Sequence, residues 1–259
     1  MGIRVAVFGA GGRMGTAVCE AVVSDADLDL VAAIDPGCVG QRISAGETEL
    51  TVSDDLDELQ RSDAEVIIDF THIDAARETL SYCAELGIHA VVGTSGFTEA
   101  DNEHLAASFT ASNCLIAPNF AIGAVLMMRF AEMAAPFFET AEIIELHHDG
   151  KVDAPSGTAV STLERMAAAS SEWAPDPVVT NTIPGARGAT GPGGIQVHSV
   201  RMRGMVAHQE VLLGTTGQTL TVRHDSYDRL SFMPGVVMAA KRIADVPGLT
   251  IGLDGVLGI

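Results

Sequence analysis

The sequence is short of positive charge. It contains 15 lysine and arginine residues against 34 aspartate and glutamate residues, which gives a formal net charge of −19 at pH 7. Proteins that bind nucleic acid carry a basic surface, because they must neutralise phosphate groups. We therefore expect no nucleic-acid partner, although a local cluster of cations and helix N-termini can still bind a small anion.

Cysteine and long apolar runs are also scarce. The four cysteines form no C-x-x-C pair, and a chain of 259 residues needs no disulfide to hold its core, so we expect free thiols. The apolar segment 120–130 is too short to cross a membrane and contains Arg129. The first residues lack the basic region and apolar run of a signal peptide. We therefore expect a cytoplasmic protein with no membrane partner.

The first 35 residues have the pattern of a dinucleotide-binding unit. An apolar strand at 3–8 leads into a glycine-rich turn at 9–15, and a helix follows. Glycines allow the backbone to approach a pyrophosphate, whose charge the helix N-terminus favours. The spacing is G-x-x-G-x-x-G rather than the commoner G-x-G-x-x-G, so the turn alone is a weak signal.

Asp35 strengthens this interpretation, because it ends a second apolar strand at 30–34 and lies 20 residues after Gly15. An acidic residue at this place binds the two hydroxyls of the adenosine ribose and repels a 2′-phosphate. Arg13 in the turn can nevertheless reach such a phosphate. We expect NADH to be used well and NADPH to be tolerated. The alternative is a structural βαβ unit with a solvated aspartate.

Strands and helices alternate as far as residue 120. Strands are expected at 66–71, 88–92 and 114–117, with helices at 74–86 and 99–111 between them. This order predicts a doubly wound parallel sheet, in which ligands bind at the carboxyl ends of the strands. The small and polar residues that follow these strands can line the nicotinamide side, although turn chemistry explains them equally well.

The segment 145–159, E-L-H-H-D-G-K-V-D-A-P-S-G-T-A, concentrates groups suited to proton transfer. A strand over 141–146 ends at His147 and His148, which should point to opposite faces. Lys151 follows a turn, and Ser156 is placed to cap a helix, whose free N–H groups can bind an anion. An imidazole, an ammonium and an anion cradle suit a substrate that carries carboxylates and needs a proton.

Each of these features also has an ordinary explanation. A histidine pair often combines one packed and one solvated ring, a single lysine can be a surface charge, and P-S-G-T can be a simple helix cap. Zinc is disfavoured, because neighbouring histidines on a strand do not reach one point and no third ligand has a suitable spacing. We therefore expect no metal.

The last part of the chain differs from the first. A long loop is expected at 171–194, which is rich in proline and glycine. Strands at 195–202, 207–213 and 219–225 follow one another without helices, which predicts an antiparallel or mixed sheet. A closing helix is expected at 236–244.

These motifs together resemble the 4-hydroxy-tetrahydrodipicolinate reductase (dihydrodipicolinate reductase) family of bacterial diaminopimelate and lysine synthesis. The resemblance covers nearly the whole chain and is most specific in H-H-x-x-K followed by P-S-G-T-A. The segment 224–235, H-D-S-Y-D-R-L-S-F-M-P-G, is similar to actinobacterial members in particular. The other motifs that carry it are G-A-G-G-R-M-G, D-F-T, G-T-S-G and A-P-N-F-A-I-G.

The resemblance implies reduction of 4-hydroxy-tetrahydrodipicolinate, with loss of water, to tetrahydrodipicolinate by NADH or NADPH. It implies that His147 and Lys151 are catalytic proton donors. The residues implied to hold the dicarboxylate substrate are His148, Ser156, Gly157 and Thr158. The residues implied to hold the cofactor are Gly9, Ala10, Gly11, Gly12, Arg13, Met14, Asp35, Gly93, Thr94, Ser95, Ala117, Pro118, Asn119 and Phe120.

The resemblance also implies a Rossmann-like α/β domain formed by 1–119 and 229–259. The inserted α+β domain at 120–228, built on a mixed sheet, would bind substrate and assemble a homotetramer. Ser95 stands where many members have threonine, and Asp149-Gly150 replaces a more basic pair, which should lower the positive charge near the dicarboxylate. The alternatives are another NAD-linked dehydrogenase of a small acid or amino acid and, less favoured, a nucleotide-sensing module.

Overall fold

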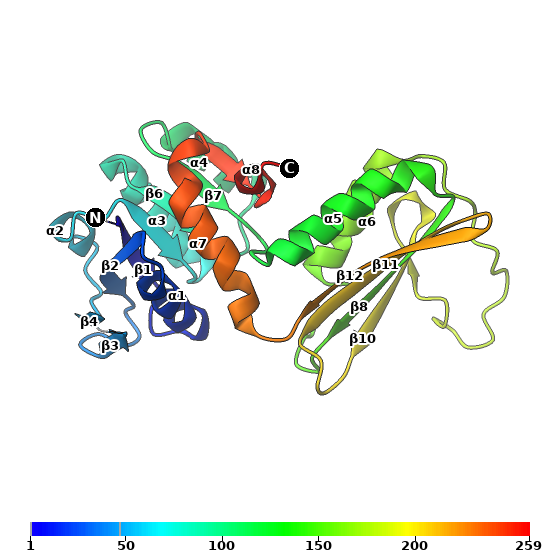
Figure 1. Cartoon of the computed structure of the whole chain (residues 1–259), viewed down its shortest axis with the longest axis horizontal. Coiled ribbons are helices and arrows are strands. Elements are labelled where there is room, and N and C mark those ends of the chain that lie inside the picture. Colours follow the sequence, from blue (N-terminus) through cyan, green and yellow to red (C-terminus); the bar gives the residue numbers. More distant parts are fainter. Residues whose placement is uncertain (1, 47) are drawn as a thin grey trace. The chain divides into compact units, whose positions relative to one another are not determined.

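The chain divides into two compact units in a computed structural model that describes residues 2–46 and 48–259. The first unit comprises Met1–Phe120 and Arg229–Ile259, and the second comprises Ala121–Asp228 (Figure 1). The second unit is therefore an insertion in the sequence of the first. Within the described residues, no helix is both long and apolar enough to cross a membrane.

A six-stranded parallel sheet forms the centre of the first unit, as the alternation of strands and helices predicted. Its strand order is β13-β7-β6-β5-β1-β2. The strands are β1 (Ile3–Phe8), β2 (Leu28–Ile34), β5 (Val66–Asp69), β6 (His89–Val92), β7 (Cys114–Ile116) and β13 (Leu249–Ile251). The helices are α1 (Arg13–Ser24), α2 (Glu58–Arg61), α3 (Ile73–Leu86), α4 (Glu99–Ser108), α7 (Met233–Arg242) and α8 (Asp254–Leu257).

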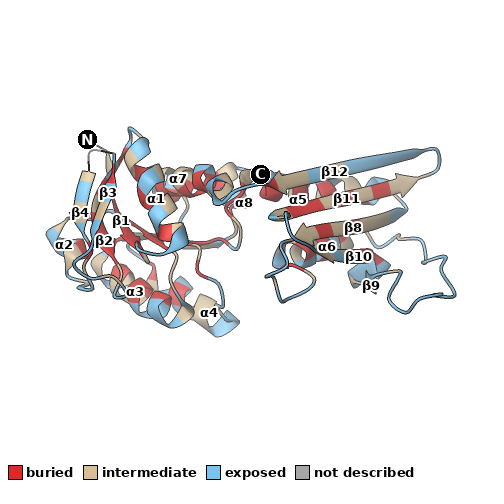
Figure 2. Ribbon diagram, turned by 90° about the horizontal axis from the view of Figure 1, so that it is seen from below, coloured by how far each residue is buried: buried red, intermediate tan, exposed pale blue. Residues whose placement is uncertain are grey.

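Burial on both faces explains the continuous apolar sequences of these strands. All four residues of β5 are buried, and Ile67, Val91 and Leu115 on three adjacent strands have no exposed surface. Figure 2 shows the same strands as the most continuously buried part of the unit. A parallel sheet covered by helices on both faces favours such runs over an alternating pattern.

Local signals in the sequence account for the helix ends of the first unit. Thr98 and Asp101 form a capping box at the start of α4, and Gly87 ends α3 in the left-handed conformation at φ 70°. At Gly15 in α1, a Cβ atom would lie 2.0 Å from the Gly9 carbonyl oxygen. Only glycine therefore allows the helix to approach the turn this closely.

A small hairpin interrupts the alternation and was not predicted. Its strands are β3 (Arg42–Ala45) and β4 (Thr48–Thr51), which pair with each other and stand apart from the main sheet. Their side chains are mostly exposed or half-buried, so the segment lacks a clear apolar period. A segment of this kind gives little sequence signal for a strand.

The second unit has a mixed sheet, in agreement with the predicted antiparallel or mixed sheet, and its five strands are in the order β12-β11-β8-β10-β9. The central strand β8 is parallel to β10 and antiparallel to β11. Its elements are α5 (Ile122–Ala134), β8 (Thr140–His147), α6 (Gly157–Ala169), β9 (Ala189–Thr190), β10 (Gln196–Arg201), β11 (Ala207–Thr215) and β12 (Gln218–Ser226). Residues 170–188, between α6 and β9, contain no helix or strand, in agreement with most of the loop predicted at 171–194; its last residues form β9 and a 3-10 turn at Pro192–Gly194.

Helices α5 and α6 cover one face of this sheet (Figure 1). Ile143 and Val211, which pair across β8 and β11, are fully buried with Leu163 and Met166 of α6 in one core. The alternate residues of the strands belong to the opposite face. Ile144 and Leu212 on that face are only half-buried, so the sheet has one covered and one open side.

Candidate active site

A cavity of about 410 Å³ lies at the carboxyl ends of β1 and β2, where the glycine turn meets Asp35. Five of the predicted cofactor residues line it: Gly9, Gly12, Arg13, Met14 and Asp35. Phe70 and Thr71 also line it, and they follow β5 at a strand end where a ligand was expected. Pro36, His72 and Ala75 complete the lining and were not predicted to bind the cofactor.

The carboxylate of Asp35 is held by the backbone of the turns on either side of it. The Gly11 N–H donates to one oxygen at 3.0 Å and the Gly37 N–H donates to the other at 2.8 Å. Each carboxylate oxygen retains a further lone pair, so both can still accept a hydrogen bond from a ribose hydroxyl. The glycine turn and the acidic residue are therefore fixed relative to each other.

Cys38 lies beside this pair. A Cβ atom on Gly11 would come within 2.3 Å of the Cys38 sulfur, so any other residue here would have to displace that side chain. Burial, the charge of Asp35 and a hydrogen bond to that carboxylate raise the pKa of the Cys38 thiol. The sulfur is half-buried, and it was not predicted as a neighbour of the ribose site.

The turns after β5 and β6 are joined by the buried carboxylate of Asp69. Its Oδ1 atom accepts hydrogen bonds from the hydroxyls of Thr71 at 2.8 Å and Thr94 at 2.7 Å. The Thr71 N–H also donates to the Thr94 hydroxyl at 2.9 Å. The Thr94 side chain is thus used inside the protein, and a cofactor would meet the backbone of this turn rather than that hydroxyl.

The three segments that follow β5, β6 and β7 lie at one edge of the sheet. Phe70 packs against Phe120 with ring centroids 5.7 Å apart, and a Cβ atom on Gly93 would lie 2.0 Å from the Phe70 ring. The Ala117 N–H donates to the Val92 carbonyl at 3.0 Å. Residues 93–95 and 117–120 therefore adjoin, as the parallel topology required, and Pro118 and Ser95 are exposed there.

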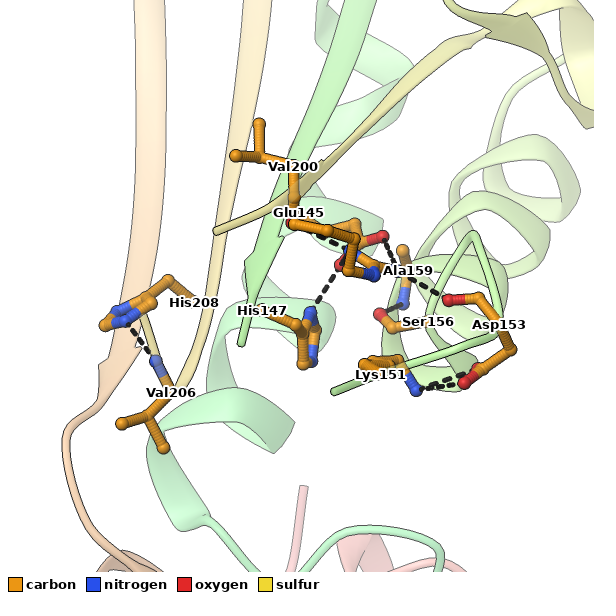
Figure 3. A network of polar contacts seen from close by, with 10 residues as sticks. Glu145, His147, Lys151, Asp153, Ser156, Ala159, Val200, Val206 and His208 are labelled. Atoms are coloured by element: carbon orange, nitrogen blue, oxygen red, sulfur yellow. Dashed lines mark hydrogen bonds and ion pairs between the residues drawn. The ribbon is translucent and has the colours of Figure 1, made fainter. Parts of the chain in front are cut away.

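In the second unit, His147 ends β8 on the same face as Glu145, because the two residues are two apart on a strand. The Nδ1 atom of His147 is 2.5 Å from Glu145 Oε2. Figure 3 draws this contact as a dashed line. Arg201 of β10 donates two hydrogen bonds to Glu145, at 3.0 and 2.8 Å. The Glu145 side chain has no exposed surface, whereas that of His147 is 16% exposed. The buried Glu145 therefore fixes the His147 ring, and a ligand can reach that ring from solvent.

The electrostatics of this pair follow from burial and charge. Burial alone would raise the pKa of Glu145, but hydrogen bonds from Arg201, Ser199 and His147 outweigh it and hold the pKa below its ordinary value. Burial lowers the pKa of His147; the adjacent Glu145 opposes this shift, while the charges of Lys151 and Arg201 add to it. Glu145 is therefore ionised at neutral pH, while the net effect of burial and charge on His147 favours its neutral ring.

Lys151 lies in the loop that follows β8, with its ammonium group on Asp153. The two carboxylate oxygens of Asp153 are 2.9 and 2.7 Å from Lys151 Nζ, and this contact is visible in Figure 3. Asp153 is 60% exposed, so a ligand carboxylate can replace it. The sequence did not indicate this partner.

Ser156 caps α6, as the sequence predicted. Its hydroxyl accepts the Ala159 N–H at 3.2 Å and is buried, so the cap uses the side chain. Gly157 is the first residue of α6 and is exposed. The free N–H groups at such a helix start can bind an anion, which would lie near Gly157 and Thr158.

His148 and Asp149 lie outside this arrangement. His148 is exposed in the turn after β8, and its N–H donates to the Val206 carbonyl at 3.4 Å. The Asp149 carboxylate accepts a hydrogen bond from Arg203 at 2.9 Å. The arginine offsets part of the negative charge of Asp149, which the sequence led us to expect near the substrate. Among residues 2–46 and 48–259, no group of three histidine, cysteine or acidic side chains is arranged to hold a metal.

Two family models match this chain and together span nearly all of it. Residues 3–120 match the N-terminal model of dihydrodipicolinate reductase, and residues 123–257 match its C-terminal model. The chain belongs to the dihydrodipicolinate reductase family. A family member from Cutibacterium acnes, named 4-hydroxy-tetrahydrodipicolinate reductase, is 51% identical over 99% of both chains.

Other dihydrodipicolinate reductases agree with this assignment. A 4-hydroxy-tetrahydrodipicolinate reductase from Mycobacterium marinum is 50% identical over 99% of this chain and the whole of that protein. The dipicolinate-bound dihydrodipicolinate reductase of Paenisporosarcina sp. TG-14 is 38% identical, with a TM-score of 0.89 over 98% of this chain and 99% of that one. An amine dehydrogenase from Mycobacterium smegmatis shares the fold alone, at 15% identity and a TM-score of 0.66.

Proposed function

We propose that this protein reduces 4-hydroxy-tetrahydrodipicolinate, with loss of water, to tetrahydrodipicolinate, using a reduced nicotinamide cofactor. The observation that carries the proposal is the match along the whole chain to reductases of this name at about half identity. The reaction belongs to diaminopimelate and lysine synthesis in the cytoplasm. No observation favours the alternative of another NAD-linked dehydrogenase.

The first unit is the dinucleotide-binding part of this proposal. Asp35 would accept the hydroxyls of the adenosine ribose, and the exposed glycine turn would face the pyrophosphate. The reduced nicotinamide supplies a hydride when it is bound. The residues proposed to hold the cofactor are Gly9, Ala10, Gly11, Gly12, Arg13, Met14, Asp35, Gly93, Thr94, Ser95, Ala117, Pro118, Asn119 and Phe120.

The second unit supplies the proton and the substrate contacts. His147 and Lys151 donate protons as charge grows on the substrate, and a group of suitable pKa is most effective in this role. The N-terminus of α6 at Gly157 and Thr158 binds one substrate carboxylate, with Ser156 shaping the turn and His148 at the rim. Lys151 binds the same dianion after it leaves Asp153.

NADH is the preferred cofactor in this proposal, and NADPH is accepted. Asp35 repels a 2′-phosphate, while Arg13 in the same cavity offsets part of that repulsion. The Asp35→Ala variant should lower kcat/KM for NADH and shift the ratio of the two kcat/KM values toward NADPH by about 10-fold. An unchanged ratio would contradict the role of Asp35.

Assembly as a homotetramer through the second unit is supported by the open face of its sheet. Ile144 and Leu212 are half-buried there without a covering helix, and apolar surface of this kind marks an interface. The Leu212→Glu variant should dissociate the assembly, as measured by light scattering coupled to gel filtration. A wild-type monomer would reject this assembly.

The test of the reaction follows NADH absorbance with the product of the preceding synthase generated in the cuvette. Oxidation should require both the synthase and Lys151, so Lys151→Ala is the matched control. An inactive wild type that still binds NADH and NADPH would reject the reductase function and redirect the search to other small acids.

A further inference from the structure

We propose that Glu145 and Arg201 form a positioning pair, which fixes the ring of His147 and ties it to the loop that carries Lys151. Neither residue touches the substrate in this scheme, and both act through the two proton donors. The inference rests on the proposed function of His147 and Lys151. It names residues that are 56 positions apart in the sequence and neighbours only in the folded sheet.

The contacts of Glu145 keep its carboxylate ionised. Its side chain is fully buried, both oxygens accept hydrogen bonds from Arg201, and Ser199 and His147 add further hydrogen bonds. A buried carboxylate with a bidentate arginine partner stays ionised and can only accept hydrogen bonds. The atom that faces it, His147 Nδ1, must therefore carry a proton.

This constraint selects the atom of His147 that does chemistry. With the proton fixed on Nδ1, the neutral ring presents a lone pair at Nε2, and the charged ring presents an Nε2–H donor. The substrate-side proton is therefore gained and lost at Nε2 alone. The negative charge of Glu145 also stabilises the charged ring, which is the form that donates the proton.

Arg201 connects this histidine to the lysine loop. One of its terminal nitrogens, Nη2, donates to Glu145 at 2.8 Å and also to the carbonyl of Asp153 at 2.7 Å. Asp153 in turn carries the ammonium of Lys151 on its side chain. A planar guanidinium can hold the carboxylate and the carbonyl together, whereas the single ammonium of a lysine cannot reproduce that geometry. The Arg201 side chain thus connects the two proposed proton donors, His147 and Lys151.

The charged groups around His147 come from β8 itself, from β10 and from the loop after β8. They are Glu145 on β8, Arg201 on β10, and Lys151 with Asp153 in the loop 148–156. Only Glu145 among them bonds the ring, at 2.5 Å. Loss of the Glu145 charge should therefore lower the pH at which His147 releases its proton. Lys151 and Arg201 favour the neutral ring, and Asp153 lies farther away.

The same strand provides a matched control. Glu142 of β8 also binds a histidine, His198, at 2.7 Å, and an arginine, Arg187, through two hydrogen bonds at 2.9 and 2.6 Å. It is three residues from Glu145 and so lies on the opposite face of the strand. Glu142→Gln removes the same charge from the same kind of cluster, outside the site.

The experiment compares Glu145→Gln with Glu142→Gln in the full-length protein. The first readout is the NMR titration of the His147 ring without substrate, assigned by the signal that His147→Gln removes. The second is the dependence of kcat and KM on pH. Glu145→Gln should lower the His147 titration midpoint and move the alkaline limb of kcat to lower pH, with a loss of about 10-fold or more at neutral pH.

Acidification should restore part of the activity of Glu145→Gln, and the KM of this variant for NADH should equal that of the wild type. The dependence of kcat on pH in Glu142→Gln should also match the wild type. An unmoved His147 titration, or a loss of kcat that is equal at all pH values, would overturn the proposal. If Glu145→Gln does not fold, Ser199→Ala and Arg201→Lys replace it. Each of these variants should shift the His147 midpoint by less than Glu145→Gln would. The absence of any shift would contradict the proposed role of Glu145 and Arg201. The titration needs no turnover, so it separates failure of this proposal from failure of the reductase function.

Discussion

Two clusters on β8 contain the same three residue types and serve different ends. Glu145 joins His147 and Arg201, whereas Glu142 joins His198 and Arg187. The hydrogen-bond distances are similar in the two clusters, and each arginine binds its carboxylate through two nitrogens. The Glu145 side chain has no exposed surface, while that of Glu142 is 37% exposed. Burial, not the set of groups, is the main difference between them.

This difference explains what each cluster holds. The Glu142 cluster lies on the open face and anchors the long loop, because Arg187 also pairs with Asp176 at 3.2 Å. The Glu145 cluster lies on the covered face and ends at a ring that is reachable from outside. A carboxylate inside the protein interacts strongly with its partners, whereas a solvated one is screened. The same residues thus fasten a loop in one place and orient a proton donor in the other.

The largest expected contrast is in turnover. Replacing His147 by glutamine should lower kcat by about 10²–10⁴-fold, because a positioned general acid contributes that much. Replacing His198 by glutamine should leave kcat within about twofold, since His198 bonds Glu142 and is not a proposed proton donor. Steady-state assays of the two variants make the comparison, and an equal loss in both would erase the distinction between the clusters.

The next contrast is in stability. Arg201→Ala leaves a fully buried carboxylate without its cation and should cost about 3–5 kcal/mol in the free energy of unfolding. Arg187→Ala breaks a partly solvated pair and should cost about 1 kcal/mol or less. Urea unfolding monitored by circular dichroism measures both. A larger cost for the Arg187 variant would show that burial is not what separates them.

The smallest contrast concerns the two aspartates next to these clusters. Asp153→Asn frees Lys151 from its carboxylate and should lower KM for the dicarboxylate by about two- to fivefold, which is the scale of an exposed ion pair. Asp176→Asn, beside Arg187, should leave that KM unchanged. A rise in KM for Asp153→Asn would mean that Asp153 helps Lys151 to bind the substrate rather than competing with it.

The sequence predicted most of the architecture for identifiable reasons. Buried parallel strands such as β5 are continuous apolar runs, and the capping signal at Ser156 marked the start of α6. The glycine turn and Asp35 were predicted together and line one cavity. The β3–β4 hairpin was missed, because half-exposed strands outside the main sheet carry no strong period.

Within the second unit, the sequence identified the segment that carries His147 and Lys151 but not the residues that hold them. Arg201 reaches Glu145 only because β10 pairs with β8 in the register that places Arg201 opposite His147. Such pairing is a long-range property, which local patterns do not encode. The inward use of the Thr94 hydroxyl was hidden for the same reason, since Asp69 belongs to another strand.

The position of Cys38 makes it a site for chemical labelling. Cys19, Cys83 and Cys114 are buried, whereas Cys38 is half-buried. A thiol reagent must reach the sulfur that it modifies, so Cys38 should react first, although the pKa of its thiol is raised as well. A fluorophore attached there would stand next to Asp35, and its emission would report when a nucleotide occupies the neighbouring cavity.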